Sequence, residues 1–86
     1  MEVSFHHRFK KRYRKIPADE QKKCDERIEL FIGQPFHRLL NNHALTGKYH
    51  GYRSINITGD LRAIYEFVSD NSAFFIFVGS HAELYG

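Results

Sequence analysis

Residues 53–67 read RSINITGDLRAIYEF and carry the clearest structural pattern in the chain. Apolar and polar residues alternate on both sides of a turn at residues 58–60, which predicts two strands joined as a hairpin. Both strands must direct their apolar residues to one core, so the turn must contain an odd number of residues. The sequence therefore predicts that Asn56 lies opposite Arg62, on an open face away from the core that can receive a ligand.

Working outward, a second turn at residues 69–72 is followed by the continuous apolar run FFIFV at residues 74–78. A run of this kind predicts a strand in the middle of a sheet. At the other end of the chain, Val3 and Phe5 lie two positions apart and predict a short first strand. Residues 34–51, between the two halves, are expected to be mostly loop.

Two helices are predicted between the first strand and this loop. Apolar residues recur at spacings of three and four from Phe5 to Ile16, and again from Cys24 to Phe31. Pro17 separates the two helices, and Gly33 ends the second. The order β-α-α-β-β-β predicts a single α+β domain over residues 1–86, with a two-helix hairpin on one face of a mainly antiparallel four-stranded sheet.

Composition narrows the function classes further. The 86 residues contain 42% hydrophobic residues, enough for one small core, and no apolar run has the ~20 residues that a membrane span needs. The opening MEVSF lacks the features of a signal peptide, so a cytoplasmic protein is expected. Cys24 is the only cysteine, which excludes an internal disulfide. No spacing of histidines and acids matches a metal motif, so neither a metal nor another cofactor is expected.

Positive charge is concentrated on the first predicted helix. The chain has a net charge of +3, but residues 8–15 alone carry six basic side chains, so the remainder sums to −3. A basic surface of this kind favours a nucleic acid or an acidic protein as partner. The six residues are Arg8, Lys10, Lys11, Arg12, Arg14 and Lys15.

Three stretches in the second half resemble the YafQ-like branch of the RelE/ParE superfamily of bacterial toxins. Residues 43–53 (HALTGKYHGYR) are similar to its H-x-L-x-G…G-x-R stretch, and residues 59–65 (GDLRAIY) to its D-x-R-x-I-Y strand. Residues 79–85 (GSHAELY) are similar to its C-terminal G-[ST]-H-x-x-[LV]-[FY] motif. The resemblance implies an endoribonuclease that cuts mRNA in the ribosomal A site. It also implies a cognate antitoxin that blocks the toxin in a hetero-oligomer.

The resemblance also nominates site residues. Metal-free RNA cleavage uses the 2′-hydroxyl of the RNA as nucleophile, which requires a base, an acid and a cation at the phosphate. His43, Asp60 and His81 are the candidate catalytic residues. Asp60 acts either as a base or by holding a histidine in its useful tautomer. The candidates for RNA or phosphate binding are Arg53, Arg62, Asn56 and Tyr85.

Several of these positions also have a structural interpretation. Ser80 and Glu83 form an S-x-x-E capping box that would hold His81 rigidly, and Arg53 has an alternative as part of an ion pair. Asn56 stands where YafQ-like toxins often carry a histidine, and Leu61 stands where they often carry a tryptophan. Three other functions therefore remain open: a ParE-like gyrase inhibitor, a non-catalytic RNA-binding or ribosome-binding module, and a folded toxin that binds its antitoxin but has lost activity.

Overall fold

The computed structural model of the chain describes residues 1–85, with side chains through Leu84. Its centre is a sheet in the order β1-β5-β4-β3-β2, in which β1 runs parallel to β5 and all other neighbours are antiparallel. The predicted α+β fold is confirmed, but the sheet has five strands and not four. The strands are β1 (Glu2–Phe5), β2 (His43–Ala44), β3 (Arg53–Asn56), β4 (Leu61–Ser69) and β5 (Ser72–Ser80).

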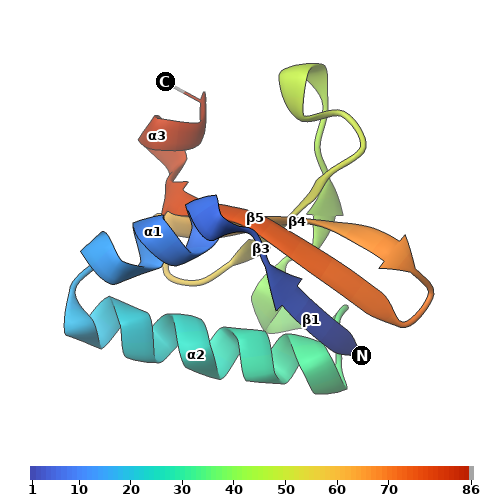
Figure 1. The fold of residues 1–86 in the computed structure, drawn as a ribbon, viewed down its shortest axis with the longest axis horizontal. Coiled ribbons are helices and arrows are strands. Elements are labelled where there is room, and N and C mark those ends of the chain that lie inside the picture. Colours follow the sequence, from blue (N-terminus) through green and yellow to red (C-terminus); the bar gives the residue numbers. More distant parts are fainter. Residues whose placement is uncertain (86) are drawn as a thin grey trace.

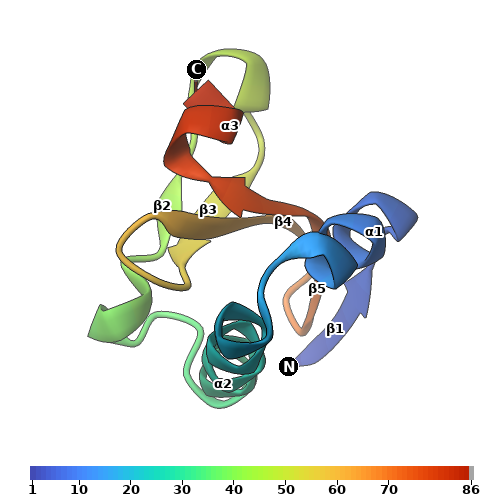
Figure 2. The same ribbon diagram turned by 90° about the vertical axis from the view of Figure 1, so that its left-hand side faces the viewer.

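Two helices cover one face of this sheet, as the apolar spacing predicts. Helix α1 (His7–Lys15) lies along β5, and α2 (Ala18–Gly33) runs beneath the sheet (Figures 1 and 2). Pro17 directly precedes α2, where a missing N–H costs nothing, and the helix ends at Gly33. Within residues 1–85, none of the helices has the length and apolar character needed to cross a bilayer.

The main core lies between the helices and the sheet and is largely aromatic. The ring of Phe31, from α2, packs edge-on against Tyr65 and Phe75, with ring centroids 4.8 and 5.2 Å apart. All three side chains are fully buried. Aromatic pairs in this geometry add about 0.5–1.5 kcal/mol each beyond the area that they bury. This aromatic packing therefore holds the central strands of the sheet in place from the helix side.

The predicted hairpin register is confirmed. Asn56 pairs with Arg62 across β3 and β4, and Ile55 pairs with Ala63. Ile55 and Ala63 are fully buried on the helix side. Asn56 and Arg62 therefore face the other side of the sheet, because successive side chains of a strand alternate between its faces.

This second face is less open than the sequence predicts, because the later part of the segment at residues 34–51 is ordered and rises over it, whereas Leu40, from its first part, packs into the main core. The segment contains the 3₁₀ turns η1 (Arg38–Leu40) and η2 (Gly47–Tyr49), with β2 between them. Its later part and the short C-terminal helix α3 (His81–Tyr85) both rise on the side of the sheet opposite α2 (Figure 1). A second small core of Leu45, Ile64 and Leu84 forms beneath them.

Candidate active site

The uncovered part of this second face holds a hollow of about 250 Å³. Three stretches of chain, far apart in sequence, contribute to it: the segment around β2, the β3–β4 hairpin and the start of α3. Its lining consists of Asn41, His43, Ser54, Arg62 and His81. The hollow therefore brings together both histidines and one arginine that the sequence nominates. Whether they act on a substrate stays a prediction.

His43 reaches the hollow because β2 pairs with β3. The antiparallel register sets His43 directly opposite Ser54, so both side chains lie on the face that carries Arg62. The His43 ring is exposed, and its Nδ1 lies 2.7 Å from the backbone carbonyl oxygen of Asn41. A carbonyl oxygen only accepts hydrogen bonds, so Nδ1 carries the proton. In the neutral ring, Nε2 is therefore left with a lone pair that can accept a proton.

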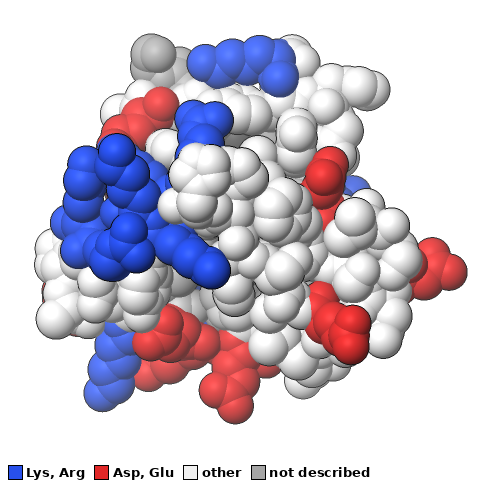
Figure 3. Space-filling view, viewed as in Figure 1, with Lys and Arg blue, Asp and Glu red and all other residues white. Residues whose placement is uncertain are grey.

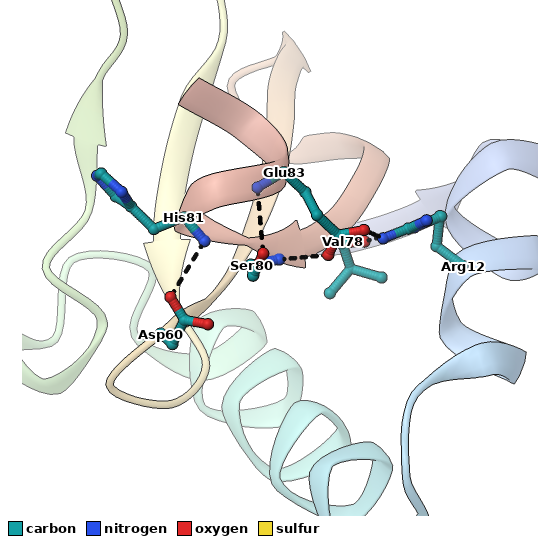
Figure 4. A network of polar contacts seen from close by, with 6 residues as sticks. All are labelled: Arg12, Asp60, Val78, Ser80, His81 and Glu83. Atoms are coloured by element: carbon teal, nitrogen blue, oxygen red, sulfur yellow. Dashed lines mark hydrogen bonds and ion pairs between the residues drawn. The ribbon is translucent and has the colours of Figure 1, made fainter. Parts of the chain in front are cut away.

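His81 is the first residue of α3 and is held from two sides. Its backbone N–H donates to the carbonyl oxygen of Asp60 at 3.0 Å and to Asp60 Oδ1 at 3.3 Å. On the other side, Ser80 and Glu83 form the capping box that the sequence predicts. The Ser80 N–H donates to Glu83 Oε1 at 2.9 Å, and the Glu83 N–H donates to Ser80 Oγ at 3.1 Å. Figure 4 shows this arrangement, in which the His81 ring and the Glu83 side chain leave α3 in opposite directions.

Arg12 extends this network to α1. Its guanidinium forms an ion pair with Glu83, its Nε donates to the carbonyl oxygen of Val78 at 3.5 Å, and it stacks 5.1 Å from the ring centroid of Phe77. Arg12 is one of the six basic residues predicted to form a binding surface. It is half-buried and engaged within the protein, whereas the other five are exposed. Figure 3 shows Lys and Arg gathered over α1, with acidic side chains mainly below this patch and on the right of the view.

Arg62 contributes the positive charge at the hollow. Its Nη1 donates to the backbone carbonyl oxygens of Thr58 at 2.9 Å and Leu61 at 3.3 Å. These contacts bend the side chain back over the hairpin turn and occupy one of the three guanidinium nitrogens. A guanidinium retains its charge at all accessible pH values and offers five donors, so the fixed Arg62 can still bind a phosphate.

Asp60 and Arg53 do not line the hollow. The contacts of Asp60 with His81 run through the backbone N–H of His81, which gives Asp60 a place in holding the start of α3. Arg53 donates from Nε to Asn42 Oδ1 at 2.8 Å and stacks 5.4 Å from the ring centroid of Phe36. These contacts anchor Arg53 structurally, through a hydrogen bond and an aromatic ring instead of the ion pair considered from the sequence.

Asn56 and Tyr85 are placed less directly. Asn56 shares the face of Ser54 but lies outside the lining of the hollow, and its buried Oδ1 has no hydrogen-bond partner among residues 1–85. Tyr85 ends α3, and its side chain lies outside the part of the chain that the structure describes. Among the described residues, no group of three or more His, Cys, Asp or Glu side chains could hold a metal ion.

The sequence reasoning missed Ser54 and Asn41. Ser54 lies two positions before Asn56 on the same strand, so the period-two rule alone assigns it to the same face. That signal was available in the sequence. Asn41 gave no such signal, because its left-handed backbone (φ 44°) and its contact with His43 depend on how residues 34–51 fold.

Comparison with known proteins supports this fold over its full length. The family model described as a bacterial toxin of type II toxin–antitoxin systems, YafQ, matches residues 1–86. Among curated proteins, no sequence matches the chain significantly.

Solved structures match the fold. The structure of YafQ from E. coli strain BL21(DE3) has a TM-score of 0.75 and 23% identity, and the match covers 99% of this chain and 98% of that one. A YoeB/ParE toxin from Agrobacterium tumefaciens has a TM-score of 0.77 and 22% identity, with 94% and 99% covered. The E. coli DinJ–YafQ complex has a TM-score of 0.68 and 22% identity, with 99% and 98% covered.

Proposed function

The chain belongs to the YafQ family of bacterial toxins of type II toxin–antitoxin systems, and we propose that it is an endoribonuclease that cuts mRNA on the ribosome. The observation that carries this proposal is the shared hollow, which sets His43, His81 and Arg62 around one space. Two imidazoles can exchange protons near neutral pH, and a guanidinium can neutralise a phosphate between them. A gyrase inhibitor with the same fold has no need of this combination.

The proposed reaction uses only groups of the protein and the RNA. The lone pair on His43 Nε2 accepts the proton of a ribose 2′-hydroxyl, and the resulting oxygen attacks the adjacent phosphorus. The bond from phosphorus to the 5′-oxygen of the next nucleotide breaks, and a protonated His81 donates a proton to that oxygen. The products are a 2′,3′-cyclic phosphate and a free 5′-hydroxyl. Arg62 stabilises the negative charge that builds up on the phosphate oxygens.

The base is assigned to His43 from its hydrogen bond to the Asn41 carbonyl oxygen, which leaves Nε2 as the acceptor. Asp60 acts in this scheme as a positioning residue, because its contacts are with the backbone of His81 and not with the reacting atoms. Asn56 and Tyr85 remain proposals for RNA contact. The unpartnered Oδ1 of Asn56 supports its part in this, since a ribose hydroxyl or a base amino group would satisfy it.

Silencing by a cognate antitoxin is the second part of the proposal. The E. coli YafQ structure in complex with DinJ has the same fold as this chain. The exposed basic residues of α1 offer a surface for ribosomal RNA or for an acidic stretch of antitoxin. Binding to ribosomes is expected to weaken by at least about 10-fold between 50 and 200 mM salt if several phosphates are contacted. Salt-independent binding would refute a phosphate-binding role of α1.

The test of the catalytic proposal is RNA cleavage in a translation extract, mapped by primer extension. We expect His43→Ala and His81→Ala each to lower cleavage by about 10²–10⁴-fold, the usual contribution of one proton-transfer group. His50→Ala is the matched control, because His50 is also an exposed histidine but lies outside the hollow. If His81→Ala cuts as fast as the parent chain, or if the parent inhibits gyrase and leaves RNA intact, the proposal is wrong.

A further inference from the structure

One polar side chain at the hollow has no partner within the protein. Ser54 is fully buried in the middle of β3, and it is the one buried polar residue among those described. Its Oγ forms no hydrogen bond with any group in residues 1–85. Ser54 nevertheless lines the same hollow as His43, Arg62 and His81. The hydroxyl therefore lies at the floor of the candidate active site, with its donor unused.

Such a group is unfavourable for folding. A buried hydroxyl without a hydrogen bond loses its contact with water and gains nothing in return, and most buried polar groups in proteins are satisfied. Alanine would fit the same strand position without that loss. The position of Ser54, at the floor of a hollow with two imidazoles and a guanidinium around it, indicates that the missing partner comes from a ligand.

We propose that Ser54 Oγ donates a hydrogen bond to a non-bridging oxygen of the scissile phosphate, from the floor of the hollow beside Arg62. This inference rests on the proposed function and adds a substrate-contacting residue to it. A neutral donor in a closed-off position interacts more strongly with a developing negative charge than the same group in water. Ser54 complements Arg62, whose Nη1 is already committed to the hairpin turn.

A phosphate reaches this hydroxyl only when side chains of the lining move, because Ser54 has no exposed surface in the free protein. His43 and His81 are exposed at the rim, and Arg62 is half-buried. In the proposed complex, an RNA that engages both rings displaces them from the positions that they hold in the free protein and opens the floor as it enters. Ser54 itself is fixed, because its neighbour Ile55 is fully buried in the main core and holds β3 in register.

The test measures stability and cleavage on the same full-length variants. Ser54→Ala should raise the melting temperature by about 4 °C or more, because it removes an unsatisfied buried group. The same change should lower cleavage by about 10–100-fold, mainly in kcat, because the hydrogen bond strengthens in the transition state. Ser54→Cys, with a similar shape and a weak donor, should show the same loss of cleavage. Ser4→Ala, an exposed serine on β1, is the control and should change neither quantity.

A lower melting temperature or an unfolded Ser54→Ala protein would overturn the inference, because the hydroxyl would then have a structural partner. Unchanged cleavage by both Ser54 variants would overturn it as well. If the parent chain cuts no RNA, the proposed function fails separately. In that case the affinities of the Ser54→Ala variant and of the parent chain for a 2′-O-methyl oligonucleotide are compared, because this oligonucleotide carries the phosphates and resists cleavage. An affinity of Ser54→Ala equal to that of the parent chain would also refute the inference.

Discussion

The attachment of α3 offers a quantitative test of how the site is held. This helix has five residues, far fewer than the 12–15 that an isolated helix needs for even marginal stability in water. Its position therefore depends on contacts with the rest of the protein. Glu83 supplies two of them, the cap on the Ser80 N–H and the ion pair with Arg12. We expect Glu83→Ala to loosen α3, and His81 with it.

The magnitude follows from these two contacts. Loss of a capping interaction costs about 1 kcal/mol. The ion pair adds between 0 and about 1 kcal/mol, because both side chains are partly exposed to solvent and screened by it. A total of about 1–2 kcal/mol raises the open population of α3 by a factor of about 5–30. Glu83→Gln keeps an oxygen that can accept from Ser80 and removes only the charge, so its effect should be at most about 5-fold.

Amide hydrogen exchange over α3 is the direct assay, because local opening changes the exchange rate while the main core stays folded. Glu29→Gln, an exposed glutamate on α2 on the opposite side of the molecule, is the matched control (Figure 1). High salt should raise exchange in the parent chain toward the level of Glu83→Gln, since salt screens the ion pair. Exchange over α3 that is the same in Glu83→Ala and the parent would refute the proposed attachment.

Three further predictions concern parts of the structure outside the hollow. Asn42→Ala should lower the free energy of unfolding in urea by about 1–3 kcal/mol, since its amide hydrogen-bonds the buried Tyr65 hydroxyl at 2.6 Å; an unchanged midpoint would contradict this. Burial raises the pKa of Cys24 to about 12, so iodoacetamide at pH 8 should label this thiol only in denaturant, and rapid labelling of the folded chain would show an open core. His6 caps α1 by accepting from the Arg8 N–H, and partial burial and neighbouring positive charges lower its pKa below 6.5. The contribution of His6 to stability is therefore present above pH 6.5 and is lost as the pH falls through its folded-state pKa. His6→Asn should remove this part of the pH dependence of the melting temperature.

The elements that the sequence predicted well are those determined by local pattern. The apolar spacing located both helices, with Pro17 between them and Gly33 at the end. Hairpin parity predicted the pairing of Asn56 with Arg62, because a shift of one residue would have buried an arginine. These features depend on neighbours within a few residues or on one turn, so a single sequence contains the information needed.

The segment at residues 34–51 could not be predicted in the same way. β2 has two residues, His43 and Ala44, which is too short to leave any alternation in the sequence. It exists because Ser54 and Arg53 provide a strand edge to pair with, and that edge is defined only after the sheet forms. The structural role of Arg53 has the same origin, since Asn42 and Phe36 reach it from this segment.

The second small core explains how the candidate residues meet. Each of its buried members lies close in sequence to one residue of the hollow and on the same side: Leu45 is two positions after His43, Ile64 is two after Arg62, and Leu84 is three after His81. Two positions return to the same face of a strand, and three return to the same side of a helix. Packing these three apolar side chains together therefore aligns the neighbouring polar groups above the sheet. Because this cluster is separate from the aromatic core beneath the sheet, the site can loosen while the fold persists.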